Sequence, residues 1–537
     1  MPGFTLTAQR LTPNAAKKCV VVFAEKGGKL TEAAQVVDEA LGGFVKSTLK
    51  SSRYQGGMGE ITRLTVGGGA IRSVVVVGVG KLSTATATWW HIGLGLGKTL
   101  DGLGVKEATI ALGELEANTA ACALKMVEGL HMAMYRFDQF KTELKEHQQP
   151  RFETVSVLTS TRSAREIEEQ WPATQKLLAG NDTTRTAVNL PPNLANPQFM
   201  AEEAKKLEKL GVKVEIFDEK QLKKMGCNLI LAVGGSAAEA DQPRLITLHY
   251  QGAGKDAPTY AIVGKGIMFD TGGYNVKPGN SMRGMKFDMA GAAAVLGTMQ
   301  ALAARKAKVN VVGTMACAMN MIGTNPFVMD SIYKAYNGTT VEIGHTDAEG
   351  RLVLADAVAY TIEKFKPDAL VDLATLTGAC MVALGAKYAG LFTTKDALGN
   401  ALKKAGADVG ELLWELPSDD DYQSKSEVAD ICNDSAGGWG GASVGATFIK
   451  KFVGKTPWAH LDIAGTANAE KITGGNKYLK GGTGFGQRLL VTWLESLQVE
   501  TAATPARKRR GRPAKAATGE AATSTGKRGR GRPRKAA

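Results

Sequence analysis

The sequence has few of the features that mark secreted, membrane-spanning or histidine-ligated metal proteins. Its six cysteines are scattered without close pairs, which favours reduced structural thiols over a disulfide framework. Its six histidines include no pair at the spacing with which one helix holds a metal. No apolar run has membrane-spanning length, and no secretory signal heads the chain. These absences predict a protein that is not secreted and has no membrane partner.

Acidic residues are almost absent from the C-terminal end. The formal net charge is +14, and from Thr501 onward twelve Lys and Arg stand against Glu520 alone. That segment carries eleven of the fourteen net charges, so the rest of the chain is nearly neutral. Its composition is chiefly Ala, Thr, Gly, Pro, Lys and Arg, which cannot bury a core. Residues 499–537 are therefore predicted to be a disordered basic tail.

The rest of the chain has an ordinary globular composition, since 44% of the 537 residues are hydrophobic and 22% are charged. Strand and helix signals alternate in residues 1–162, including a helix expected near Thr31–Leu49, and predict a small N-terminal α/β domain. A charged linker helix is expected at 163–188, bent or broken at Pro172. Long apolar strands separated by helices in residues 189–498 predict a larger α/β domain with a mostly parallel central sheet.

Glycines recur at positions 93, 95 and 97, directly before Lys98 and Thr99. The run invites comparison with a phosphate-binding loop, but the first glycine of that motif would fall at Ile92. We therefore expect no phosphate site there. Nothing catalytic is visible in the N-terminal half.

Carboxylates gather between Gly264 and Leu352, where apolar strands run into glycine-rich turns. The acids concerned are Asp270, Asp288, Asp347 and Glu349. Ligands collect at strand ends in α/β sheets, and several oxygen ligands there suit one or two divalent cations. Any one of these acids alone is more often a turn residue or a helix cap. Lys265 lies inside an apolar strand, which argues against a surface lysine.

The order and spacing of these segments resemble the leucyl (cytosol) aminopeptidase family. The motifs are residues 264–273 (GKGIMFDTGG), 285–289 (MKFDM), 346–352 (TDAEGRL), 372–379 (DLATLTGA) and 460–467 (HLDIAGTA). Residues 189–193 (NLPPN) resemble the opening of the family's catalytic domain. The resemblance spans about residues 180 to 497 and implies a metal-dependent exopeptidase.

The resemblance also implies a two-metal site. Its ligands would be Lys265, Asp270, Asp288, Asp347 and Glu349, with Asp270 and Glu349 touching both ions. Zinc is expected, with manganese, magnesium or cobalt as alternatives. Nearby dications would favour the neutral amine that Lys265 needs to ligate. The ions would acidify a water for attack on the peptide bond, and one would bind the substrate's free amine.

Two further residues take catalytic roles by resemblance. Lys277 would stay charged and stabilise the oxyanion, and Arg351 would bind bicarbonate through its planar fork. The pocket for the first side chain would be lined by Met285, Thr375, Gly378, Ala464 and Ala467, an apolar set that favours Leu or Met. Thr375 and Gly378 could equally be plain core residues. His345 stands where the family usually has Asn and Thr271 where Ser is common, which leaves metal preference and pH optimum open.

Assembly and location rest on the same resemblance. The family forms a hexamer of two stacked trimers around an inner cavity, which implies a homohexamer acting on short peptides. A cytoplasmic protein is expected, with the nucleus or a mitochondrial nucleoid as alternatives because of the basic tail.

The tail contains two blocks that resemble AT-hooks. Their cores are Arg510, Gly511, Arg512 and Pro513, and Arg530, Gly531, Arg532 and Pro533. Glycine lets an extended backbone enter the minor groove of A·T tracts while the flanking arginines follow its negative floor. A nuclear-localisation signal or a generic polycation is the alternative. Two hypotheses follow: an aminopeptidase tethered to AT-rich DNA, or a DNA-binding scaffold on an aminopeptidase fold.

Overall fold

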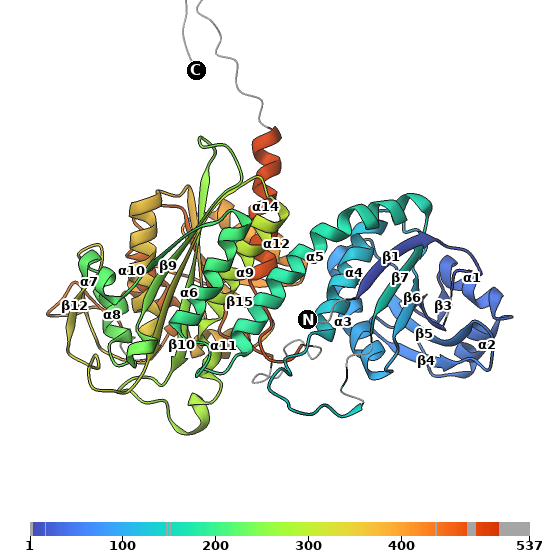
Figure 1. The fold of residues 1–537 in the computed structure, drawn as a ribbon, viewed down its shortest axis with the longest axis horizontal. Coiled ribbons are helices and arrows are strands. Elements are labelled where there is room, and N and C mark those ends of the chain that lie inside the picture. The colour runs from blue at the N-terminus through green and yellow to red at the C-terminus, as the bar shows by residue number, and fades with distance from the viewer. Residues whose placement is uncertain are drawn as a thin grey trace, which may run out of the picture.

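The computed structural model describes residues 4–16, 18–146, 149, 152–434, 438–469 and 479–503. It shows two α/β domains joined by one long helix (Figure 1), which confirms the predicted fold class. The two AT-hook-like blocks of the tail lie outside the described residues.

The N-terminal domain is built on a seven-stranded sheet with the order β1-β7-β6-β2-β5-β4, and β3 pairs with β2. The strands are β1 (Thr5–Arg10), β2 (Lys18–Glu25), β3 (Lys29–Leu30), β4 (Ile61–Thr65), β5 (Ile71–Gly80), β6 (Glu107–Ala111) and β7 (Thr154–Thr159). All pairs are parallel except those of β3 and β4. The valines of β2 and β5 are buried, as expected for a sheet covered on both faces.

The single helix expected near Thr31–Leu49 is wrong, because the segment forms α1 (Glu32–Ala40) and α2 (Phe44–Ser51). Gly42 and Gly43 separate them with φ values of 64° and 81°. This left-handed conformation ends a helix and is tolerated best by glycine.

The glycine run of the sequence lies inside α3 (Thr86–Gly102), which packs against α4 (Thr119–Met134). A β-carbon added to Gly93 would lie 1.9 Å from the backbone oxygen of Met126. One added to Gly97 would lie 2.7 Å from that of Leu130. Gly93 and Gly97 let the two helices approach closely. Helix packing therefore accounts for the glycine run, and no phosphate-binding role is needed.

The connecting helix is α5 (Thr161–Asn189), and it continues through Pro172 without a break. The expected break is therefore wrong. Buried contacts hold the C-terminal half of the helix: the guanidinium of Arg185 donates to Met132 O at 2.7 Å and to Gly482 O at 3.0 Å. Asp182 Oδ2 lies 2.9 Å from His131 Nε2. The helix is thereby fixed to both domains.

The larger domain has an eight-stranded sheet with the order β16-β15-β18-β14-β10-β11-β9-β8. The strands are β8 (Lys213–Phe217), β9 (Arg244–Gln251), β10 (Thr259–Asp270), β11 (Asn310–Asn320), β14 (Ala369–Ala374), β15 (Ala389–Thr393), β16 (Leu413–Glu415) and β18 (Trp458–Asp462). The central strands β18, β14, β10 and β11 are parallel. A small sheet is formed by β12 (Ile332–Lys334), β13 (Thr340–Glu342) and β17 (Ile431–Cys432).

Helices cover both faces of the large sheet (Figure 1). One face, with Ile262 and Val371, packs against α6 (Pro197–Lys206), α9 (Ala290–Arg305), α12 (Asp396–Val409) and α14 (Gln487–Ala503). The other, with Ala261 and Leu370, packs against α8 (Asn228–Gly234), α10 (Glu349–Phe365) and α13 (Gly441–Lys450). The remaining helices are α7 (Glu219–Met225) and α11 (Gly378–Leu384).

The helical stretch Met285–Arg305, which contains α9, is long and apolar enough to cross a membrane. Of its most apolar window, 89% is buried inside the protein. No stretch of this kind was expected from the sequence. Its burial is that of a core helix packed on the large sheet.

All six cysteines are free, and all but Cys432 are buried.

Candidate metal centre and active site

The site lies at the carboxyl edge of the central strands. Asp270 ends β10 and Asn320 ends β11, and the two residues are register partners. Glu349 is the first residue of α10 and Asp347 lies in the loop before it. Asp288 belongs to a 3-10 turn, Met285–Met289 (η5), that leads into α9. Because neighbouring parallel strands end at one edge, loops distant in sequence meet there.

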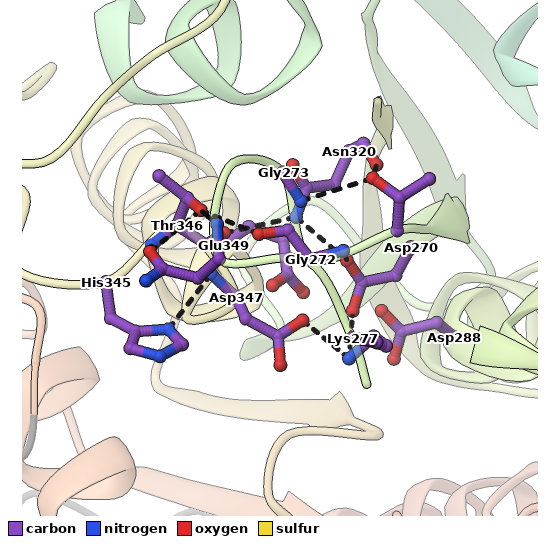
Figure 2. Close-up of polar contacts among 12 residues, drawn as sticks. Asp270, Gly272, Gly273, Lys277, Asp288, Asn320, His345, Thr346, Asp347 and Glu349 are labelled. Carbon is purple, nitrogen blue, oxygen red and sulfur yellow. Dashed lines mark hydrogen bonds and ion pairs between the residues drawn. The ribbon is translucent and has the colours of Figure 1, made fainter. Parts of the chain in front are cut away.

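Three carboxylates converge at this edge. Asp270, Asp347 and Glu349 each offer an oxygen within 4.8 Å of the others. Figure 2 shows the three side chains turned toward one another, with Lys277 between Asp270 and Asp347. Asp270 and Glu349 are buried, whereas Asp347 is half-buried.

Two lysines lie among the acids. Lys265 Nζ is 2.8 Å from Asp288 Oδ2 and 2.9 Å from Glu349 Oε1. It also donates to Thr375 O at 3.0 Å. Lys277 Nζ is 2.7 Å from Asp270 Oδ2 and 2.6 Å from an Asp347 oxygen. Six of the seven polar candidates thus form two ion-paired groups, one around Lys265 and one around Lys277, and Arg351 lies outside both.

The acids dominate the charge balance at both lysines. Burial lowers the pKa of Lys265, but Asp288, Glu349 and Asp270 outweigh it, so the pKa lies well above its ordinary value. Burial likewise lowers the pKa of Lys277, but the negative charges of Asp270 and Glu349 outweigh burial and raise this pKa above its ordinary value. The protein's own charges therefore keep both lysines protonated. Only additional positive charge nearby would release a proton from Lys265.

Each carboxylate disfavours the ionisation of its neighbours. Burial, followed by the charges of Asp270 and Glu349, raises the pKa of Asp347 to about 7. Burial also raises the pKa of Asp288 well above its ordinary value, against the opposing charge of Lys265. Four acids in contact with two lysines leave negative charge uncompensated at this edge.

The donor set fits divalent cations. Glu349 Oε2 is buried and has no hydrogen-bond partner among the residues that the structure describes. A buried carboxylate oxygen without a partner is costly unless a cation neutralises it. Several carboxylate oxygens and one amine nitrogen are ligands that zinc and manganese accept.

Polar residues that were not expected from the sequence hold these candidate metal-binding residues in place. Asn320 Nδ2 donates to Asp270 Oδ1 at 2.8 Å, and Gly272 N donates to the same oxygen at 2.9 Å. Asn433 Oδ1 accepts from the backbone of Gly344 at 2.8 Å and of His345 at 3.1 Å. Asn320 could have been found from its place at a strand end, but no local signal marks Asn433.

Arg351 is buried beside this loop. Its Nη1 donates to Asn433 O at 2.9 Å, and its Nε has no hydrogen-bond partner in the described part of the chain. Burial lowers the pKa of Arg351 against the opposing charge of Glu349. A free guanidinium donor is compatible with a small planar anion. His345, at the position of departure from the family pattern, accepts from Asp347 N through Nδ1 at 3.2 Å (Figure 2).

A cavity of about 540 Å³ opens over the carboxylates. The five residues expected to contact the substrate side chain all line it, and they are Met285, Thr375, Gly378, Ala464 and Ala467. Thr375 Oγ1 also donates to Asp288 Oδ1 at 2.8 Å, which ties the cavity wall to the acids. Sequence reasoning missed Met381 and Asn468, which line the same cavity.

The fold and the site together define a protein of two α/β domains with a candidate site for divalent cations at a strand edge. Comparison with known proteins narrows this class. The catalytic-domain profile of the cytosol aminopeptidase family matches residues 182–491, and its N-terminal-domain profile matches residues 20–144. The chain therefore belongs to the cytosol aminopeptidase family, whose members are metallo-exopeptidases.

Relatives match along most of the chain. A probable cytosol aminopeptidase of Brucella ovis is 42% identical over 490 residues, covering 88% of this chain and 94% of the relative. The cytosol aminopeptidase of Pseudomonas aeruginosa is 40% identical over 493 residues, with 90% and 97% covered.

Solved structures match equally widely. A mutant of tomato leucine aminopeptidase superposes with a TM-score of 0.80 at 30% identity, covering 92% of this chain and 97% of that one. The bottromycin maturation enzyme BotP in complex with Mn gives a TM-score of 0.76 at 27% identity, covering 90% and 100%.

Proposed function

We propose that this aminopeptidase uses two divalent cations to release N-terminal residues, preferably Leu and other apolar residues, from short peptides. One observation carries the proposal. The carboxylates of Asp270, Asp347 and Glu349 form a cluster with oxygens within 4.8 Å of one another, in the wall of a cavity that is also lined by Met285, Ala464 and Ala467.

The metal ligands in this proposal are Lys265, Asp270, Asp288, Asp347 and Glu349. When bound, the two ions supply an acidified water and polarise the scissile carbonyl. Zinc is the ion we favour, with manganese, magnesium and cobalt as alternatives; the neighbouring structure with Mn supports this group of metals.

Two basic residues act on the substrate side. Lys277 remains protonated among Asp270 and Asp347, so it can donate to the oxygen on which charge develops. The buried Nε of Arg351 has no partner among the described residues and would donate a hydrogen bond to one oxygen of a bicarbonate ion.

The lining of the cavity supports the proposed preference for apolar residues. Met285, Ala464 and Ala467 present methyl and thioether groups, and Gly378 leaves room for a side chain because nothing lies within 4 Å of its β position. A flexible methionine adapts to branched and unbranched chains. A charged first residue would lose its hydration without a partner there.

Substitution of Lys277 and Asp347 tests the assignment. Lys277→Ala removes the oxyanion donor together with its ion pairs to Asp270 and Asp347, and should lower kcat on a leucyl anilide by at least about 10²–10³-fold. Asp347→Ala should abolish turnover and also lower the bound metal, measured by elemental analysis.

Lys404→Ala and Asp408→Ala are matched controls, since these residues form an exposed ion pair on α12. Near-wild-type turnover in Lys277→Ala or Asp347→Ala would refute the site assignment.

Assembly, tail and location complete the proposal. We propose a homohexamer, with a mass about six times the 56.6 kDa of one chain. Its basic tails would bind AT-rich DNA through Arg510, Gly511, Arg512, Pro513, Arg530, Gly531, Arg532 and Pro533. Relatives named cytosol aminopeptidase support a cytoplasmic location, and the tail alone motivates the nucleus or nucleoid as alternatives.

A further inference from the structure

A second cavity, of about 390 Å³, lies at the seam between the two domains. The N-terminal domain contributes Trp90 from α3 and Met132 from α4, and the catalytic domain contributes Glu411, Phe485 and Arg488. Figure 1 shows α3 and α4 at the side of their domain that approaches the catalytic domain. This interdomain cavity contains none of the carboxylates of the metal centre.

Buried donors without partners distinguish the interdomain cavity. Trp90 Nε1, Arg488 Nε and Arg488 Nη1 make no hydrogen bond with any residue that the structure describes. Both side chains are almost fully buried, with 3% of Trp90 and 1% of Arg488 exposed. The guanidinium carbon of Arg488 lies 4.5 Å from the centre of the Trp90 ring, so the donors belong to one packed unit. Buried donors of this kind require an acceptor.

Nearby acids do not satisfy these donors. Arg488 Nη2 is 3.2 Å from Glu411 Oε1, while Glu411 Oε2 accepts from the backbone of Gly486 and Leu489. Glu128 Oε2 is 3.8 Å from Arg488 Nη1, beyond hydrogen-bond reach, and both Glu128 oxygens accept from Lys125 at 2.9 Å. Glu411 therefore pairs with Arg488 only through Nη2, and neither glutamate accepts a hydrogen bond from Trp90 Nε1, Arg488 Nε or Arg488 Nη1.

The described lining of the interdomain cavity includes two positive residues, Lys387 and Arg488, and one negative residue, Glu411. Lys387 is exposed, whereas Arg488 and Glu411 are buried and ion-paired. A carboxylate on a ligand would add negative charge beside the two cations. The rest of the lining is largely apolar and includes Met132, Leu412 and Phe485. Pockets of this size and composition hold small molecules whose few polar groups fix the orientation.

We propose that the interdomain cavity binds a small monocarboxylate with an apolar body. Its carboxylate oxygens accept hydrogen bonds from Arg488 and Trp90, and its hydrocarbon part packs against Met132, Leu412 and Phe485. A free carboxylic acid and the C-terminal end of a short peptide share this chemistry.

The interdomain cavity shares a wall with the catalytic cavity. Ala464 and Ala467 line the catalytic cavity, whereas Gly465 and Thr466 line the interdomain one, and Asn468 lines both. The occupant would therefore contact the opposite side of the segment that faces the peptide substrate.

Calorimetric titration of the metal-loaded full chain tests the proposal with three probes. The probes are 4-methylpentanoate, its uncharged amide, and N-acetyl-glycyl-leucine, which lacks a free amine. Binding of 4-methylpentanoate at least about tenfold more tightly than the amide is expected, because hydrogen bonds from a guanidinium to a carboxylate are stronger than those to a neutral amide oxygen. Tighter binding of the acetylated dipeptide would identify a peptide C-terminus as the ligand, and tighter binding of 4-methylpentanoate a free acid.

Variants locate the binding. Trp90→Phe keeps the ring over Arg488 and removes one donor, and should weaken 4-methylpentanoate by about tenfold. Leu412→Trp fills the cavity and should abolish binding. Trp439→Phe, a matched change at an exposed tryptophan, should leave it unchanged. Circular dichroism and the melting temperature identify any variant that fails to fold.

Asp347→Ala separates this site from the catalytic cavity. Binding unchanged in that variant supports the interdomain site whether or not the proposed metal assignment is right. Binding lost in Asp347→Ala, equal affinity for acid and amide, or no heat with any probe would overturn the proposal. The last result would mean that water satisfies the buried donors.

Discussion

The two lysines of the candidate metal centre differ in how far each is buried among its acidic partners. Lys265 is fully enclosed between Asp288 and Glu349, whereas Lys277 is partly exposed to the cavity between Asp270 and Asp347. The enclosed amine of Lys265 can contact only the neighbouring acids or an ion bound between them. The exposed ammonium can reach an entering peptide, which is why we assign the substrate role to Lys277.

A second buried charge pair lies in the sheet beneath the site. His460 Nδ1 is 2.6 Å from Asp372 Oδ1, on the neighbouring strands β18 and β14, and Trp458 Nε1 donates to Asp372 Oδ2 at 2.7 Å. All three side chains are fully buried. Burial lowers the pKa of His460, but Asp372 outweighs it and the pKa lies above its ordinary value.

Asp372→Asn should therefore destabilise the protein most at low pH. A histidine whose pKa is raised by folding contributes its full stabilisation below its unfolded pKa of about 6.5, and loses it as pH rises through the folded pKa. The difference in melting temperature between wild type and variant should be largest near about pH 6 and smaller near about pH 9.

Trp458→Phe is the control, because it removes a donor to Asp372 that does not titrate in this range. Its shift in melting temperature should be the same at both pH values. A pH-independent shift for Asp372→Asn would show that the charge on His460 does not stabilise the fold.

At the scale of elements, the loop between β13 and α10 holds one proposed ligand, and Asn433 fixes it. Besides accepting from Gly344 and His345, Asn433 donates through Nδ2 to His345 O at 2.8 Å and to Ala348 O at 3.3 Å. The loop that bears Asp347 is thus bonded on both sides by one buried side chain.

Asn433→Ala should lower metal affinity or kcat/KM by about 10–100-fold, the usual effect of removing a residue that orients a ligand. Metal titration monitored with a competing chelator measures the first quantity. Asn337→Ala is a matched control in an exposed turn. Unchanged metal affinity and kcat/KM in Asn433→Ala would show that the loop is held by other contacts.

The close contact between α3 and α4 depends on glycines, which have no side chain. Gly93→Ala would put a β-carbon 1.9 Å from Met126 O, a backbone atom that cannot move alone. We expect a loss of stability of about 1–3 kcal/mol or more, seen as a lower melting temperature.

Gly102→Ala, in the last turn of the same helix, has nothing within 4 Å of its added β-carbon. It should be neutral or raise stability by up to about 1 kcal/mol, because alanine restricts the unfolded chain. Equal melting temperatures for the two variants would contradict close packing at Gly93.

At the scale of the whole molecule, α5 makes the two domains one unit. Arg185 bonds the N-terminal domain through Met132 O and the catalytic domain through Gly482 O, and stacks 4.0 Å from the centre of the Tyr135 ring. An arginine buried with backbone acceptors on both sides is costly to separate from either. The interdomain cavity therefore lies between surfaces held in fixed relation.

Removal of the tail should separate DNA binding from catalysis. A chain that stops at Ala503, the end of α14, should keep kcat/KM on a leucyl anilide. It should lose DNA retardation, and the full chain's affinity should fall steeply with salt because lysines and arginines release counterions from phosphates. Retardation by the shortened chain would assign DNA binding to the domains.

A charge-matched pair distinguishes AT-hooks from a polycation. Arg512→Gln with Arg532→Gln should abolish the preference for A·T tracts, since these arginines flank the hook glycines. Lys515→Gln with Lys527→Gln removes the same charge and should weaken binding without changing the preference. Equal effects of the two pairs would support a generic polycation.

The sequence predicted the two α/β domains, because strand and helix periodicities are local properties of the chain. It also placed Asp270 at the end of a strand, where parallel sheets bind ligands. It misjudged two elements: Gly42 and Gly43 divide one expected helix through their left-handed backbone, and α5 continues through Pro172 where a break was expected.

Only the tertiary structure decided which polar groups meet. Asn433 bonds a loop some 90 residues earlier in the chain, and Trp90 comes within contact of Arg488 across the domain seam. Such pairs leave no periodic trace, because each depends on where whole strands and helices pack rather than on its neighbours in sequence. The sequence determined which residues are available for the candidate metal site. The packing of the chain determined the distances between them, their charge balance and the separate interdomain cavity.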